Sequence, residues 1–432
     1  MRLVCLLLVW LSIGSCGASR RAKAEADTTA FVQLEFNVPS RHKATALEIH
    51  SYDNIPVLAS RSLDAISGKV TLTDTLARPQ NGPLAAFVQM ADGSLWTARL
   101  EGGEALPHGG RHFAVELSEL TETPRPSSIR AELLRQHRLP VGPGEYSGIA
   151  PVSDSVYAVV HDKGAGGGIH FFHIPIEPSG VVGFVQEKEA PGNAGQEPGH
   201  DNEDVVYVPS SNTLFVSSEA DQQVREYTLE GQPTGRSLQI PADLRDIQSN
   251  AGFEALAYDS VGGYFWAMTE QSLREEGLHR RMLRLQRFSA RTLEADARYF
   301  YLLGAPHTAP SDAAAASAYV SGLSAMTVLD DGRLITLERE VYVPSGSVLD
   351  KALGAFTLST LYVIDPLHDT AGILGKEVLC RVVTSALNLA NYEGLCLGPR
   401  LSGGARLLLL LADSQAGAGG LTAEYIQLIA IQ

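Results

Sequence analysis

Five short phrases between residues 145 and 395 each put a serine or a glutamate before a small or short residue and an aliphatic one. The chemistry-bearing residues of these phrases are Ser147, Glu203, Glu254, Ser321 and Glu393. They recur roughly every 50 to 70 residues, and such self-similarity is expected of β-propeller blades. Because equivalent positions of radial blades form a ring, we expect the five side chains to surround one central channel.

Three carboxylates close together in a shielded channel would repel one another strongly. The sequence has no Lys or Arg at an equivalent position of the repeat, so a hard cation is the simplest compensation. Ligation by carboxylates, hydroxyls and waters suits calcium better than zinc. The alternative is that the glutamates cap strand ends through hydrogen bonds to neighbouring blades.

A second set of acidic residues follows the first. A predicted hairpin comes after each phrase, and its second strand ends at Asp162, Glu219, Glu270, Glu338 or Asp413. Adjacent antiparallel strands would bring these ends to the same mouth of the channel. There they are candidates for general-base catalysis on water, beside a cation that polarises a phosphoryl or carbonyl oxygen.

A phosphate group at this mouth would also need positive partners. Basic residues near it in the sequence are Arg339, Lys163, Arg280 and Arg281. We count Arg339 with the catalytic candidates because it directly follows Glu338. The alternative for all of these residues is that they are solvated loop charges.

The repeat indicates the elements that carry these residues. Four strands can be drawn per segment, and in the second segment they are 204–208, 213–218, 224–228 and 237–240. The last segment has three, ending with 424–431, and residues 130–139 are expected to supply the fourth. Such closure leaves no open sheet edge. We therefore predict an all-β fold with a five-bladed propeller over residues 129–432, or six blades if two have been merged.

Residues 24–122 predict a separate small β-sandwich domain. Apolar and polar residues alternate over 31–38, 46–50, 69–74 and 112–117, and over 83–100 around an Asp92-Gly93 turn. Six or seven strands are expected, with no catalytic cluster. Residues 123–128 contain Pro124 and Pro126 and are the expected linker.

Residues 1–23 have the pattern of a targeting segment. The apolar stretch 3–13 is too short to span a bilayer, and it is followed by Gly14, Ser15 and Cys16. This resembles a bacterial lipobox, which predicts cleavage before Cys16 and lipidation of that residue. The alternative is ordinary signal-peptidase cleavage near Ala18. Both alternatives predict export. If the lipid anchor is present, we expect a lipoprotein of the periplasm or of the outer membrane or cell surface.

The composition of the chain limits the classes of partner that we expect. The formal net charge of -15 argues against non-specific nucleic-acid binding. Of the four cysteines, Cys380 and Cys396 lie outside the targeting segment. They form either a disulfide with each other or two buried free thiols, and the sequence is consistent with both alternatives. We expect a monomer that touches the membrane through its lipid anchor only.

The stretch from about residue 142 to the last residue resembles the phytase-like, "esterase-like activity of phytase", family of exported bacterial proteins. The resemblance rests on GFEALAY at 252–258, GRLITLERE at 332–340 and NYEGLCLGPR at 391–400. The order Ser, Glu, Glu, Ser, Glu is also similar to that of calcium-activated nucleotidases (soluble apyrases), five-bladed propellers with calcium on the axis. That similarity implies calcium ligation by Ser147, Glu203, Glu254, Ser321 and Glu393.

These observations together predict an exported calcium-dependent hydrolase that acts on a small phosphorylated substrate. The rival hypothesis is a non-catalytic surface propeller that binds a glycan or protein and holds calcium for structure. Neither phrase serine lies in a Gly-x-Ser-x-Gly elbow, so action on carboxylic esters rests on the family label alone.

Overall fold

The computed structural model describes residues 29–51, 57–80, 84–107, 109–120, 124–142, 144–162, 168–189, 201–245, 252–272, 281–369, 373–385, 388–414 and 422–432. The described secondary structure is almost entirely β, as the sequence predicted. Short helical segments are α1 (Pro310–Ala315), α2 (Val348–Gly354) and the 3-10 helix η2 (Ala242–Arg245). Neither α-helix is long and apolar enough to cross a membrane.

The first nine strands form two sheets that share one core. One sheet has the order β4-β1-β8-β7, with β1 (Thr29–Val38), β4 (Gly68–Gln80), β7 (Glu104–Leu106) and β8 (Gly110–Ala114). The other has the order β3-β2-β5-β6-β9, with β2 (Ala44–Ser51), β3 (Ala59–Ile66), β5 (Leu84–Met90), β6 (Leu95–Leu100) and β9 (Ser118–Leu120). Leu34 and Phe36 of one sheet pack with Ile49 and Val88 of the other in one apolar cluster.

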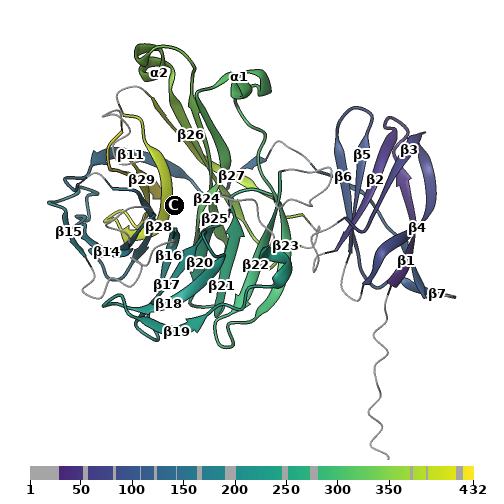
Figure 1. Ribbon diagram of the computed structural model, residues 1–432, viewed down its shortest axis with the longest axis horizontal. Helices are drawn as coiled ribbons and strands as arrows, with labels where there is room; N and C mark the ends of the chain where they lie inside the picture. Colours follow the sequence, from purple (N-terminus) through teal and green to yellow (C-terminus); the bar gives the residue numbers. More distant parts are fainter. Residues whose placement is uncertain are drawn as a thin grey trace, which may run out of the picture.

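Five further sheets follow from residue 125 onward (Figure 1). The first three are β12 (Tyr146–Pro151), β13 (Val156–His161), β14 (Gly168–His173) and β15 (Gln186–Glu189); β16 (Asn202–Val208), β17 (Thr213–Ser218), β18 (Gln223–Thr228) and β19 (Pro233–Ser237); and β20 (Phe253–Asp259), β21 (Tyr264–Thr269), β22 (Met282–Ser289) and β23 (Ala295–Leu302). The predicted strand 237–240 is therefore wrong, because the edge strand β19 pairs with β18 through residues 233–237.

The fourth and fifth sheets complete the set. The fourth holds β24 (Ala318–Val328), β25 (Leu334–Val343), β26 (Phe356–Ile364) and β27 (Glu377–Ser385), with β10 (Arg125–Pro126) added in parallel at its edge. The fifth holds β28 (Asn391–Arg400), β29 (Arg406–Asp413) and β30 (Tyr425–Ile431), with β11 (Ala131–Arg138) from the start of this region. The predicted pairing of 130–139 with the last strand is confirmed by the β11–β30 register.

The first strands of the five sheets contact one another in a closed cycle. β12 contacts β16, β16 contacts β20, β20 contacts β24, β24 contacts β28, and β28 returns to β12. These five strands are called the inner strands below. Cys380 on β27 and Cys396 on the inner strand β28 are free thiols.

Glycines allow the inner strands to approach closely. A Cβ atom on Gly148 of β12 would lie 2.5 Å from the Asp204 Cα of β16. Gly394 of β28 meets the backbone oxygen of Ser147 in the same way, and Gly322 of β24 meets the Glu270 side chain. The inner strands are therefore packed backbone to backbone, with no room for a side chain at these points.

Aromatic contacts join the N-terminal sheets to the third of the five later sheets. In Figure 1 the strands β1 to β7 lie to one side of the later strands. The rings of Phe87 and Phe300 meet edge to face with centroids 5.4 Å apart, and His50 packs on both. The Arg284 guanidinium lies 3.8 Å from the centre of the Phe300 ring. These buried contacts fix one face of β5 against β22 and β23.

The close approach at Gly148 gives a first prediction. We expect Gly148→Ala to lower the free energy of unfolding by about 1–3 kcal/mol, because the added methyl group must push two inner strands apart. Gly403→Ala is the control, since a Cβ there meets nothing within 4 Å. Urea denaturation of both variants measures the effect, and equal stability of the two would contradict the packing described.

Candidate metal centre

Each inner strand has a β-bulge, which lies near the amino end in four of them and in the middle of β24. The register shifts between Tyr146 and Ile149, between Asn202 and Val205, between Phe253 and Ala255, between Leu323 and Ala325, and between Tyr392 and Gly394. Bulges bend a strand and re-aim its side chains, and they are common beside functional sites. Each bulge holds one serine or glutamate, and these residues are Ser147, Glu203, Glu254, Ser324 and Glu393.

The fourth sheet differs from the sequence expectation. Ser321 lies opposite Glu340, three residues before the bulge, and Ser324 occupies the bulge. The Ser324 hydroxyl lies 3.3 Å from the Leu337 carbonyl oxygen and 3.2 Å from that of Tyr392. Ser324 therefore joins the fourth and fifth sheets through backbone oxygens. The prediction that Ser321 is the equivalent residue is wrong because β24 and β25 also pair on the amino-terminal side of this bulge. The Ser321-Gly322-Leu323 phrase lies in that additional paired stretch.

The strand-end residues follow the same register. In each sheet, the inner-strand residue just before the bulge pairs with a residue at the end of the next strand. In four sheets the residue that follows this partner is acidic: Asp162, Glu219, Glu270 and Asp413. In the fourth sheet Leu323 pairs with Glu338, so the equivalent position belongs to Arg339. One basic residue thus stands where the other four sheets carry a carboxylate.

Glu338 belongs to a different cluster, between the third and fourth sheets. Its Oε1 accepts hydrogen bonds from the Tyr301 hydroxyl at 2.6 Å and from Lys376 Nζ at 2.5 Å. Its Oε2 accepts from the backbone N–H of Gly304 at 2.8 Å. Burial lowers the pKa of Lys376, and Glu338 opposes that shift. These partners give Glu338 a structural ion pair away from the bulge residues.

Arg339 is buried between two carboxylates. Its Nη2 lies 3.1 Å from Glu270 Oε1, and its Nη1 forms an ion pair with Glu393. Asn391 bridges the same group, since it donates to Glu393 at 2.7 Å and accepts from Arg339 at 3.3 Å. The expectation that no basic residue compensates the acidic ring is therefore wrong, because Arg339 neutralises part of it.

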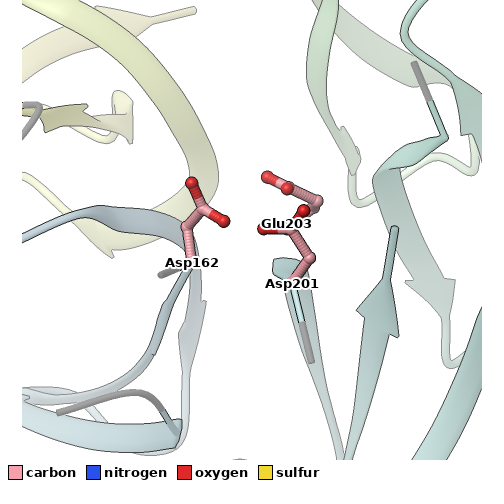
Figure 2. A group of neighbouring side chains, drawn as sticks. All are labelled: Asp162, Asp201 and Glu203. Atoms are coloured by element: carbon pink, nitrogen blue, oxygen red, sulfur yellow. The ribbon is translucent and has the colours of Figure 1, made fainter. Parts of the chain in front are cut away.

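The remaining carboxylates form one cluster, which we call the carboxylate cluster. It consists of Asp162, Asp201, Glu203, Glu219 and Glu254. Asp162, Asp201 and Glu203 each offer an oxygen within 4.8 Å of the others, and so do Glu203, Glu219 and Glu254. Figure 2 shows the Asp162 carboxylate turned toward Asp201 and Glu203 across a gap. Glu203 belongs to both groups and lies between the two halves of the cluster.

Asp201 was not among the predicted site residues. It lies on the backbone next to Glu219, whose N–H donates to the Asp201 carbonyl oxygen at 2.7 Å. Its spacing of two residues from Glu203 is the available signal, because alternate residues of a strand share one side. The neighbouring Asp204 has a different role. It accepts backbone N–H bonds from Val205 at 2.8 Å and from Leu256 at 2.7 Å, and so braces β16 against β20.

The electrostatics of the carboxylate cluster favour a cation. Burial, followed by the charges of Glu203 and Glu270, raises the pKa of Glu254 well above its ordinary value, although Arg339 opposes this. Four of the five cluster residues are at most 8% exposed. Buried like charges at such distances are unfavourable without a counterion or a shared proton.

The donor set fits calcium. All five side chains offer carboxylate oxygens, which hard cations prefer. The Ser147 hydroxyl, in the bulge of β12, is buried and has no hydrogen-bond partner among the described residues, so it is available as a further ligand. The residues whose oxygens lie close enough together to share an ion are those of the carboxylate cluster. Glu393 is instead engaged by Arg339.

Of the other basic candidates, Arg281 is in the described part of the chain, and its contacts are with residues outside the carboxylate cluster. Arg281 donates from Nη1 to the Leu303 carbonyl oxygen at 3.2 Å, and the charge of Arg281 acts on Lys376. Lys163 and Arg280 lie outside the described residues. The expected phosphate-binding group of basic residues thus has one described member beside the cluster, Arg339, whose Nη1 and Nη2 both contact carboxylates.

A further acidic group adjoins Asp413 at the junction of the fifth and first sheets. Glu424 accepts at Oε1 from the backbone N–H of Gly144 at 2.7 Å and contacts the Ser414 hydroxyl. That hydroxyl is also 2.8 Å from the Gly144 carbonyl oxygen. Burial raises the pKa of Glu424 to about 7.

Comparison with known protein families identifies this region. Residues 142–415 match the family described as "Phytase-like: Esterase-like activity of phytase". The chain belongs to the phytase-like family. The predicted resemblance is confirmed, and the matched residues include every member of the carboxylate cluster together with Arg339. The N-terminal sheets lie outside the match.

Other comparisons are distant. No curated protein sequence matches the chain. Among solved structures, a streptogramin B lyase is 12% identical with a TM-score of 0.30, covering 70% of this chain and 98% of its own. An α-L-arabinofuranosidase from Podospora anserina in complex with cellotriose is 8% identical with a TM-score of 0.38, covering 72% and 99%. The β-xylosidase RS223 is 12% identical with a TM-score of 0.38, covering 69% and 95%.

The Arg339 ion pairs of the phytase-like domain give a second prediction. We expect Arg339→Met to lower the free energy of unfolding by about 3–5 kcal/mol in the presence of a chelator, because two buried carboxylates lose their partner. Arg400→Met is the control, since Arg400 and its partner Asp330 are both more than half exposed. We expect that change to cost at most about 1 kcal/mol. Similar costs for the two variants in urea denaturation would contradict the assignment.

Glu424 gives a third prediction. Its folded-state pKa of about 7 lies above the ordinary value of 4.5, so the unfolded chain releases this proton at lower pH. Its contribution to stability is fully present below pH 4.5 and is lost as pH rises through 7. Glu424→Gln keeps the neutral form and should flatten the stability profile over this window. The exposed Glu294→Gln is the control, and an unchanged slope in Glu424→Gln would count against the buried proton.

Proposed function

We propose that this protein is an exported, calcium-dependent hydrolase that acts on phosphoesters. The single observation that carries the proposal is the carboxylate cluster, in which two groups of three residues that share Glu203 each place their oxygens within 4.8 Å of one another. We further infer a five-bladed propeller, in which each of the five sheets is one blade, preceded by a small β-sandwich formed by the two N-terminal sheets. The closed cycle of inner strands supports that count.

The proposed ligands are Ser147 and the members of the carboxylate cluster. We retain Ser147, Glu203 and Glu254 from the sequence prediction, and replace Ser321 and Glu393 with Asp162, Asp201 and Glu219. A calcium ion bound there would polarise a phosphoryl oxygen and offset its charge. The Gly252 N–H donates to Glu219 Oε1 at 2.6 Å and orients that carboxylate.

The chain's own residues supply positioning and proton transfer. Arg339 forms ion pairs with Glu270 and Glu393, so we assign it to positioning these carboxylates and not to substrate phosphate. Asp162 faces the cluster from the strand end at the mouth, and we propose that it accepts the proton of the attacking water (Figure 2). The family description, esterase-like activity of phytase, supports a phosphate ester as the bond that is cleaved.

Export and membrane attachment rest on the first residues of the sequence. We propose cleavage before Cys16 and acylation of that cysteine, which would display the domain outside the cytoplasm. The formal charge of -15 suits such a protein and disfavours nucleic acid as a partner.

A purely structural calcium ion is the second candidate, and one observation favours it. Four of the five cluster residues are at most 8% exposed, so the ion could brace neighbouring sheets without meeting substrate. In that case the domain would bind a glycan or a protein by another surface.

A fourth prediction separates these functions. We expect the full chain with calcium to release phosphate from at least one of a panel that includes inositol phosphates and nucleotides, and to stop when a chelator is added. Glu254→Gln should weaken calcium binding in calorimetry at least tenfold and abolish release, while the exposed Glu294→Gln should leave both unchanged. Calcium binding without turnover on any phosphoester would contradict the hydrolase and support the structural ion.

A further inference from the structure

A cavity lies at the carboxyl ends of the inner strands. Its volume is about 530 Å³, and residues of all five inner strands line it. The carboxylate cluster lies at the amino ends of these strands, and none of its members is among the residues that line this cavity. The two sites are therefore at opposite ends of the inner strands. This volume lies in the range of about 300–1,000 Å³ that is typical of small-molecule sites.

Apolar side chains of all five inner strands form part of the wall of this cavity. Each inner strand contributes the residue two positions beyond its bulge residue, and all five are at most 2% exposed: Ile149, Val205, Leu256, Met326 and Leu395. A wall of this composition favours the apolar part of a ligand.

One guanidinium group lines the cavity without a carboxylate partner. Arg406 begins β29, and in the described part of the chain its buried Nε has no hydrogen-bond partner and no ion pair joins it to an acid. Its neighbours Cys396 and Tyr157 stay neutral, because burial raises the pKa of both. Arg406 is partly exposed, and among the described residues no ion pair balances its charge beside this wall.

The acidic residues of this cavity are already engaged. Asp330 forms an ion pair with Arg400, and Asp259 accepts backbone N–H bonds from Val261 at 2.9 Å and Gly262 at 2.8 Å. Arg400 donates also to the Gly404 carbonyl oxygen. An anion from outside the chain would therefore complete the pairing of Arg406.

We propose that this cavity binds a small amphiphilic monoanion, an apolar body with one carboxylate. The carboxylate would accept hydrogen bonds from the Arg406 guanidinium, and the apolar body would lie against the five inner-strand side chains. This site is independent of the calcium-dependent function proposed above, because it shares no residue with the carboxylate cluster.

Calorimetric titration of the full chain tests the proposal, with sodium octanoate as the probe and 1-octanol as its neutral counterpart. We expect saturable octanoate binding that weakens about tenfold or more in Arg406→Gln, because a charged hydrogen bond is lost. Octanol binding should change less than about twofold, since it depends on the wall alone. The variant should remain folded, because the change removes an uncompensated charge, and thermal melting followed by circular dichroism checks this.

Arg61→Gln is the control, because Arg61 belongs to the N-terminal sheets, pairs with Asp74 and does not line this cavity. Its octanoate affinity should equal that of the unmodified protein. A chelator should leave octanoate binding unchanged, which separates this site from the carboxylate cluster. The proposal is overturned if octanoate fails to bind, if Arg406→Gln binds it as well as the unmodified protein, or if binding requires calcium.

Discussion

Repulsion among carboxylates at one end of the axis is the constraint on which the arrangement of this domain depends. Bulges in the inner strands bring Glu203, Glu254 and Glu393 to this end, and the adjoining strand ends add further acids. Buried charges of one sign need compensation. The fourth sheet supplies it for Glu270 and Glu393 through Arg339, and we propose that a cation supplies it for the carboxylate cluster.

The fold holds this charge distribution in place through contacts between sheets. Bare glycines let the inner strands approach, and Asp204 ties β16 to β20 through two backbone N–H groups. The contact of β28 with β12 closes the cycle, and β11, which precedes the first sheet, pairs with β30 in the last. Because each acid is fixed by its own strand, the carboxylates cannot relax apart as they would on mobile loops. The cluster is thus preorganised for an ion, at the cost of repulsion in its absence.

Where the phrases of the repeat occur in the same register, the sequence predicted both the inner strands and the residues in their bulges. The phrase residues Ser147, Glu203, Glu254 and Glu393 all lie in bulges, and the closing pair of strands was recognisable from two unpaired segments. The fourth sheet escaped prediction because β24 and β25 continue beyond the bulge, so the phrase at Ser321 is out of register with the others. The role of Arg339 also escaped, since its partners Glu270 and Glu393 belong to other sheets. Likewise, the Lys376 partner of Glu338 follows from the packing of sheets and not from any local pattern.

The two ends of the axis have different chemistry, and the acidic end carries the central claim. A crystal structure of the full chain grown with calcium tests that claim most directly. The account predicts one ion within about 2.3–2.6 Å of carboxylate oxygens of Glu203 and its cluster neighbours, with Arg339 still paired to Glu270 and Glu393. An ion held by Glu393 with Arg339 displaced, or a saturating calcium concentration with no ion in the cluster, would contradict it.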